Sequence, residues 1–213
     1  MTTSHDEVIR HLSAADERLS ALIARVGPCL IMARAAETDH FEGLVRAITS
    51  QQLSTKAAAT IFGRLKALGL DETGTLNPKT LLSRDETLLR GAGLSGQKTR
   101  YIRDVCEKVS TGALSLDTLH AIDDEAVIAA LCSVKGVGRW TAEMFLMFRL
   151  GRPDVLPVGD LGIQKGFMKL FGLKKMPTPE KMMKLAKPFQ PYRSAACWYL
   201  WRLTEEKDGE PPR

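Results

Sequence analysis

The amino-acid sequence predicts an all-α protein. Apolar side chains recur at helical spacing in nearly every segment, and capping residues, glycines or prolines separate these segments. No stretch alternates polar and apolar residues over the length of a strand. The apolar residues 155–158 are interrupted by Pro157, which favours an extended loop. These patterns indicate about nine or ten helices joined by short loops.

The first three predicted helices have recognisable ends. Residues 13–16 have the pattern of a capping box, and Gly27-Pro28 ends the helix that follows. Residues 39–42 begin the second helix, and Ser54 is placed to cap the third, which ends at Gly69. One face of the second helix carries the apolar side chains Phe41, Leu44, Val45 and Ile48.

The later helix starts are marked in the same way. Asn77 and Pro78 place proline at a first helical position, and residues 83–86 form a second capping box. The following helices open at a capping residue or a proline: Ser95, Asp123, Pro179 and Pro191. The helix from Asp123 carries an apolar stripe at the spacing of one face: Val127, Ala130, Leu131 and Val134.

The composition is that of an ordinary globular protein with a moderate positive charge. The 213 residues are 44% hydrophobic and 26% charged, with a net charge of +5 and a pI of about 9.1. Such a charge suits a polyanionic partner without establishing one. Residues 1–7 are acidic and lack the apolar core of a signal peptide, and no apolar run is long enough to span a bilayer. We therefore expect a soluble, cytoplasmic protein.

The cysteines and histidines form no disulfide or metal-ligand pattern. They are far apart, and no C-x-x-C pair occurs. The residues concerned are Cys29, Cys106, Cys132 and Cys197, with His5, His11, His40 and His120. This spacing favours buried, reduced thiols and argues against a zinc site.

A glycine-rich turn lies near the middle of the chain, within residues 131–142. Gly136-Val137-Gly138 could in principle cradle a nucleotide phosphate, but that fingerprint needs a preceding strand and a third glycine. The third position is Thr141, and helical periodicity precedes the turn. Two interpretations remain: a plain helix–helix connection, or a hairpin whose backbone N–H groups approach a phosphate at the next helix N-terminus.

Four stretches of the chain, taken in order, carry a resemblance to a known family. They are residues 41–60, residues 89–102, the hairpin with Arg139-Trp-Thr-Ala142, and residues 154–160 followed by 191–201. The chain resembles the helix-hairpin-helix DNA glycosylase superfamily, and within it the alkylpurine branch, the DNA-3-methyladenine glycosylase II family. The resemblance implies the helix-hairpin-helix DNA glycosylase fold, with two helical subdomains flanking a DNA-binding cleft and without the N-terminal β-rich domain of the longest members.

The resemblance also implies a division of the single glycosylase unit, residues 1–213. We expect one bundle at 41–131 and a second made of 1–40 with 145–213. Residues 132–144, the hairpin and the start of the following helix, are expected at the cleft. The tail 206–213 is expected to be frayed.

By the resemblance, Asp160 carries the catalytic carboxylate. Cleavage of an N-glycosidic bond builds oxocarbenium character on the sugar, which a fixed carboxylate can stabilise. Taken alone, an Asp directly before a predicted helix is more typical of an N-cap. The two roles are compatible, because a capping side chain is held rigidly.

Trp140 occupies the position at which bifunctional members carry a nucleophilic lysine. An indole cannot form a Schiff base, so the resemblance implies a monofunctional enzyme without lyase activity. It further implies that Trp140 and Trp201 form walls of the base pocket and that Met144, one turn after Trp140, lines it. The alternative for the tryptophans is a place in the core, which we expect for Trp198.

The resemblance assigns further residues to DNA. Leu53 is the wedge that fills the gap left by a flipped base, and Gln52 helps to hold the neighbouring strand. The alternative is a buried leucine at a helix boundary. The residues expected near phosphate at the hairpin are Gly136, Gly138, Thr141 and Lys135.

Cofactor requirements follow from the same resemblance. No cofactor is required, but family hairpins often bind Na⁺ or K⁺ through backbone carbonyls, here those of Cys132, Val134 and Val137. No iron–sulfur cluster is expected, because the C-terminal part of the chain carries only Cys197.

The sequence therefore predicts a monofunctional DNA glycosylase of base excision repair. It would flip alkylated purines out of double-stranded DNA, release 3-methyladenine and also 7-methylguanine or hypoxanthine, and leave an abasic site. Two alternatives stay open: a glycosylase for uracil or mismatched bases, and a helix-hairpin-helix DNA-binding protein without catalysis. We expect a monomer that binds no membrane.

Overall fold

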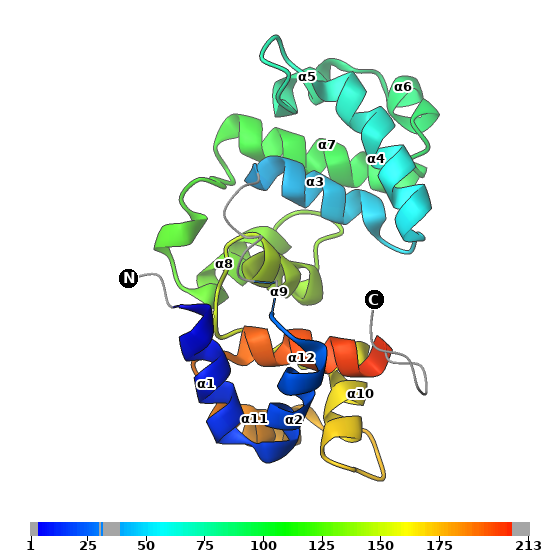
Figure 1. The fold of residues 1–213 in the computed structure, drawn as a ribbon. Coiled ribbons are helices and arrows are strands. Elements are labelled where there is room, and N and C mark those ends of the chain that lie inside the picture. Colours follow the sequence, from blue (N-terminus) through cyan, green and yellow to red (C-terminus); the bar gives the residue numbers. More distant parts are fainter. Residues whose placement is uncertain (1–3, 30, 32–38, 206–213) are drawn as a thin grey trace. The chain divides into compact units, whose positions relative to one another are not determined.

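A computed structural model describes residues 4–29, 31 and 39–205 of the chain. Within these residues the chain forms twelve α-helices, two short 3-10 helices and no β-strand, apart from one isolated bridge between Leu70 and Leu76 (Figure 1). The all-α prediction is confirmed. The tail 206–213, which we expect to be frayed, lies outside the described residues.

The chain divides into two compact units. The terminal unit consists of Met1–Ala36 with Leu146–Arg213, and the central unit is Glu37–Phe145. The hairpin residues 132–144 belong to the central unit and do not stand apart from it.

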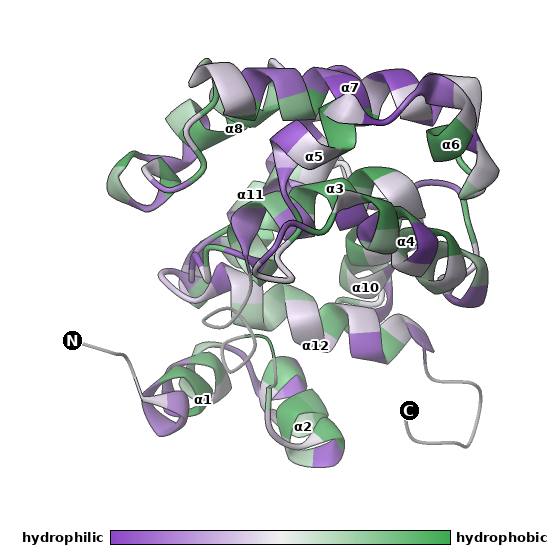
Figure 2. Ribbon diagram, turned by 90° about the horizontal axis from the view of Figure 1, so that it is seen from above, coloured by the Kyte–Doolittle hydropathy of each residue, from purple (hydrophilic) through white to green (hydrophobic). Residues whose placement is uncertain are grey.

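Helix α7 is the long element of the central unit, and α3, α5 and α6 all pack on it. The helices of this unit are α3 (His40–Ser50), α4 (Thr55–Gly69), α5 (Pro78–Ser83), α6 (Glu86–Gly91), α7 (Gly96–Thr111), α8 (Asp124–Cys132) and the first part of α9 (Arg139–Phe148), with the 3-10 helix η1 (Leu119–Ala121). Fully buried side chains include Leu44 and Ile48 of α3 and Ile102 and Val105 of α7. Hydrophilic residues dominate the face of α7 seen in Figure 2.

Helix α12 is the corresponding element of the terminal unit, where it packs on α10 and α2. The helices of this unit are α1 (His5–Ala15), α2 (Glu17–Val26), α10 (Leu161–Leu170), α11 (Pro179–Ala186), η2 (Lys187–Phe189) and α12 (Arg193–Glu205). None of the helices in the described part of the chain has both the length and the apolar composition of a membrane span.

Most helix starts coincide with the predicted capping residues, because caps are local interactions. Ser54 accepts a hydrogen bond from the Ala57 N–H, and Ser95 accepts one from the Lys98 N–H. The last helix begins at Arg193, slightly after the predicted start at Pro191, and two other predicted boundaries are wrong. Asp16 caps α2 while Ser13 lies inside α1, and Asp85 caps α6 while Ser83 ends α5. In both cases the aspartate directly before the helix has extended backbone. Its side chain therefore accepts hydrogen bonds from the first N–H groups of that helix.

Candidate functional site

The hairpin Gly136-Val137-Gly138 joins α8 to α9, and its two glycines differ. Gly136 has a φ of +80°, and a Cβ added there would lie 2.1 Å from Cδ2 of Tyr101. A Cβ at Gly138 would meet nothing within 4 Å. Val137 is 5% exposed and anchors the turn in the core. The fold thus requires glycine at position 136 but not at position 138.

The N-terminal end of α9 is braced by Arg139. Its guanidinium donates to both carboxylate oxygens of Glu125 in α8, at 2.9 and 2.5 Å, and to Glu143 one turn further along α9, at 3.1 Å. These ion pairs raise the pKa of Arg139, and the pair with Glu125 joins the two helices of the hairpin. Thr141, in the first turn of α9, is buried.

Lys135 precedes the hairpin glycines and has two different contacts with Asp104. Its backbone N–H donates to Oδ2 of Asp104 at 2.9 Å, while its ammonium group lies 3.6 Å from Oδ1. The Lys135 side chain is 71% exposed. Asp104 therefore anchors the backbone of the hairpin and leaves the lysine side chain at the surface.

The tip between α3 and α4, residues 50–54, presents Gln52 and Leu53. Gln52 has a φ of +56°, the left-handed region that a non-glycine residue seldom adopts. Leu53 is 39% exposed, so the alternative of a buried leucine at a helix boundary does not hold. Strained backbone of this kind persists where the surroundings hold it, and it is concentrated at functional sites.

A pocket of about 430 Å³ lies between the tip and α9, within the central unit. Its lining residues are Ala47, Ser50, Gln51, Gln52, Trp140, Thr141 and Met144. Trp140 is 49% exposed, so it is not a core residue. The structure thus brings two residues expected in the base pocket, Trp140 and Met144, together with Gln52, expected at the neighbouring strand, and Thr141, expected near phosphate.

Asp160 lies in the terminal unit as the N-cap of α10. Its Oδ1 accepts hydrogen bonds from the Ile163 N–H at 2.8 Å and from Nε1 of Trp201 at 2.9 Å. The aspartate is 9% exposed, and the Trp201 ring stacks on Phe148 with 5.8 Å between the ring centroids. The N-cap interpretation of Asp160 is confirmed, and its carboxylate is held by hydrogen bonds from two different helices.

The loop before Asp160 is tied to the start of α12. Arg193 donates to Oδ1 and Oδ2 of Asp154 at 2.7 and 2.9 Å. Ser194 accepts from the Val155 N–H and donates to the carbonyl of Arg152. This network holds the extended segment that leads into Asp160.

A family model describing the HhH-GPD superfamily base excision DNA repair proteins matches residues 45–191. The chain belongs to this superfamily. The matched segment contains the tip, the hairpin and Asp160, whereas Trp201 follows it.

Relatives in this superfamily cover nearly the whole chain. DNA-3-methyladenine glycosylase 1 of Schizosaccharomyces pombe is 34% identical over 214 residues, 100% of this chain and 93% of that protein. The alkylbase DNA glycosidase-like protein mag2 of the same yeast is 35% identical over 195 residues, 91% of each chain.

Solved structures agree with these sequence relatives. A DNA-3-methyladenine glycosidase from Bacillus halodurans has a TM-score of 0.82 and 37% identity, covering 96% of this chain and 92% of that chain. The 3-methyladenine DNA glycosylase of Schizosaccharomyces pombe, in complex with abasic DNA, has a TM-score of 0.79 and 32% identity, covering 96% of this chain and 99% of that chain. The resemblance seen in the sequence is confirmed.

In this HhH-GPD chain, Trp198 and the cysteines do not line the pocket beside Trp140. Trp198 is half-buried and lies edge-on to Tyr199.

Burial raises the pKa of Cys29 to about 11 and that of Cys106 to about 12, so both thiols stay protonated. Cys132 is exposed, contrary to the expectation of buried thiols, because it ends α8 beside the hairpin. Across residues 4–29 and 39–205, no cluster of three His, Cys, Asp or Glu side chains could hold a metal ion.

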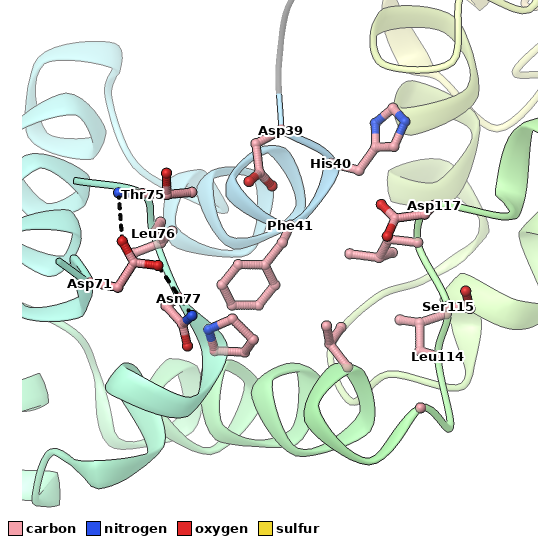
Figure 3. A pocket seen from close by; sticks show the side chains of 14 residues that line it. Asp39, His40, Phe41, Asp71, Thr75, Leu76, Asn77, Leu114, Ser115 and Asp117 are labelled. Carbon is pink, nitrogen blue, oxygen red and sulfur yellow. Dashed lines mark hydrogen bonds between the residues drawn. The ribbon is translucent and has the colours of Figure 1, made fainter. Parts of the chain in front are cut away.

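A second cavity of the central unit, about 520 Å³, contains none of the residues assigned above (Figure 3). It lies between the start of α3, the loop that precedes α5 and the loop that follows α7, with Phe41 projecting toward its middle. Its Asp71 accepts hydrogen bonds from the Thr75 N–H and from Asn77, as well as from Thr73. That carboxylate therefore stabilises its own loop.

Proposed function

We propose that the chain is a monofunctional DNA glycosylase that releases 3-methyladenine and related alkylated purines from double-stranded DNA and leaves an abasic site. The observation that carries the proposal is the buried carboxylate of Asp160, held by Ile163 and Trp201, in a chain of the HhH-GPD superfamily. Relatives named as 3-methyladenine glycosylases support the choice of substrate.

Asp160 acts on the sugar. As the N-glycosidic bond lengthens, positive charge develops on the deoxyribose ring, and a carboxylate held in one rotamer stabilises it without reorganisation. The same carboxylate orients the attacking water or takes its proton. An alkylated purine such as 3-methyladenine is already cationic, so it leaves without a second carboxylic acid.

Trp140 and Met144 receive the flipped base. Their pocket has the volume of a small-molecule site, and the exposed indole face of Trp140 offers cation–π attraction to an electron-poor, cationic purine. By the resemblance Trp201 is a second tryptophan that contacts the base, and its Nε1 holds Asp160. Because Trp140 stands where a lyase needs its lysine, no covalent enzyme–DNA intermediate forms.

The tip and the hairpin hold the DNA. The backbone N–H groups at Gly136 and Gly138, with Lys135 and Thr141, bind a phosphate, since the N-terminus of a helix attracts anions. Leu53 enters the duplex and Gln52 steadies the neighbouring strand.

The hairpin also offers a cation site. We assign a monovalent cation to the backbone carbonyls of Cys132, Val134 and Val137. Alkali cations bind carbonyl oxygen, and Cys132 is the last residue of α8, although the Val134 carbonyl already accepts from the Val137 N–H at 3.1 Å. The ion would add positive charge beside the phosphate.

The test is base release from duplexes that each carry one defined lesion. Wild-type protein is expected to release 3-methyladenine, and Asp160→Asn is expected to bind the same duplex without releasing the base. Release of uracil or mismatched bases alone would assign a different specificity. Binding without release from any duplex would indicate a non-catalytic DNA-binding protein, and borohydride trapping of an enzyme–DNA adduct would contradict the monofunctional mechanism.

We propose that the protein acts as a monomer in the compartment that holds the DNA, the cytoplasm in a bacterium.

A further inference from the structure

Helix α7 contacts both DNA-binding elements of the central unit from one side. Lys98, Tyr101 and Asp104 follow one another at intervals of three residues, so their side chains are neighbours on the helix surface. Lys98 reaches the tip, while Tyr101 and Asp104 reach the hairpin. None of the three was singled out for function in the sequence.

Lys98 holds the end of α3. Its ammonium group donates to the carbonyls of Thr49 at 2.7 Å and Gln51 at 2.6 Å. The last carbonyls of a helix lack intrahelical donors and carry partial negative charge, so a cation there is favourable. Burial lowers the pKa of Lys98, and the two short hydrogen bonds offset this cost.

The two carbonyls that Lys98 binds, those of Thr49 and Gln51, lie in the segment that leads into Gln52. Gln51 precedes Gln52, whose left-handed φ of +56° turns the chain so that Leu53 stands at the surface. The Gln51 side chain also donates to the carbonyl of Gly136 at 2.8 Å, which joins the tip directly to the hairpin. The orientation of Leu53 thus depends on backbone that Lys98 fixes.

The hairpin rests on the same helix. The Tyr101 ring occupies the space where a Cβ of residue 136 would lie, and its hydroxyl accepts from the Gln97 side chain. Asp104 accepts the Lys135 N–H at 2.9 Å and is held in turn by Lys108 at 3.0 Å. The tip and the hairpin are therefore both positioned by the same rigid helix, α7.

We propose that α7 fixes the position of the tip relative to the hairpin. In this arrangement Lys98 is a positioning residue for Leu53 and does not contact DNA. The inference rests on the proposed function, because it assigns Leu53 the task of filling the gap beside a flipped nucleotide. Without the Lys98 side chain, the protein still binds phosphate through the hairpin. It then loses the ability to distinguish a gapped duplex from an intact one.

The experiment compares the affinity for an undamaged duplex with that for the same duplex carrying a tetrahydrofuran abasic analogue. Lys98→Met is expected to lower the preference for the abasic duplex by about tenfold, while affinity for the undamaged duplex is unchanged. Lys66→Met is the matched control. Lys66 also holds α3, through Glu42 at the opposite end, and its loss removes the same charge.

A double variant separates positioning from independent binding. Because Lys98 acts through Leu53, Lys98→Met combined with Leu53→Ala is expected to show no lower preference than Leu53→Ala alone. Lys98→Arg, which keeps a donor, should restore much of the preference. It also keeps the test decisive if Lys98→Met unfolds, which a thermal melt will reveal.

Three outcomes with the variants would overturn the inference. An equal loss of affinity for both duplexes, with a shallower salt dependence, would make Lys98 a phosphate contact. Additive losses in the double variant would separate it from Leu53, and an unchanged preference in Lys98→Met would leave it without a role. The proposed function fails separately, if wild type prefers the abasic duplex but releases no base from any lesion. A wild type without that preference would refute the wedge and, with it, the inference.

Discussion

The indole Nε1 of Trp201 donates a hydrogen bond to Oδ1 of Asp160 at 2.9 Å. The bond joins the middle of α12 to the N-cap residue of α10. These two helices pack extensively on each other in the terminal unit. Gly162 permits this approach, because a Cβ there would lie 2.8 Å from the Trp201 ring and 3.1 Å from Oδ1 of Asp160.

Trp201→Phe tests the indole donor. The phenyl ring keeps an aromatic partner for Phe148 but removes the Nε1 hydrogen bond to Asp160, so the single-turnover rate of base release should fall about tenfold, with duplex affinity unchanged. Trp198→Phe is the matched control on the same helix and should keep the wild-type rate. Equal rates for wild type and Trp201→Phe would remove the donor from the mechanism.

Asp160→Asn tests the carboxylate separately from the cap. Asparagine caps helices about as well as aspartate, so the melting temperature should stay close to that of wild type while base release is lost. Asp160→Ala loses both functions and should also cost about 1 kcal/mol of stability. Thermal melts and base-release assays on the two variants measure these effects. Base release by purified Asp160→Asn would end the catalytic assignment.

The two hairpin glycines should respond differently to alanine. Gly136→Ala must adopt left-handed backbone, at about 1 to 2 kcal/mol, and must displace the Tyr101 ring, so stability and DNA binding should both fall. Gly138→Ala meets open space within the protein, so its melting temperature should match wild type while its affinity for duplex falls. Full duplex affinity in Gly138→Ala would show that no phosphate approaches there.

Asp104 should make stability depend on acid pH. Burial alone would raise the pKa of this carboxyl, but hydrogen bonds from the Lys135 N–H and from Lys108 outweigh it and hold the pKa below its usual value. A lowered folded-state pKa stabilises the protein above the unfolded pKa, and this stabilisation is lost as the pH falls through the folded pKa. Asp104→Asn should therefore melt below wild type at neutral pH, and the difference should shrink below about pH 4. A difference that is constant from pH 3 to 8 would contradict this.

The local features of the fold could be predicted, and the long-range ones could not. Ser54, Ser95 and Asp123 cap their helices as predicted, because a cap needs only the next three residues. The boundaries at Ser13 and Ser83 are wrong because two candidate caps lie close together, and backbone conformation decides between them.

The candidate site shows the same division. Motifs led to Asp160, the hairpin and the tip, and the roles of these residues stay predictions. Lys98 lies in one of the four stretches that carry the resemblance, yet no sequence pattern pairs it with the carbonyl of Thr49, which lies 49 residues earlier. Such a contact depends on how α3 packs against α7.

The capping role of Asp160 and its proposed catalytic role can be lost independently of each other. Because an amide at this position can keep the cap, Asp160→Asn would pass cellular quality control and accumulate like wild type. It would still search DNA and cover lesions that it cannot process. Such a protein would shield damage from other repair enzymes, and a cell that carries it should tolerate alkylation less well than a cell that lacks the protein altogether.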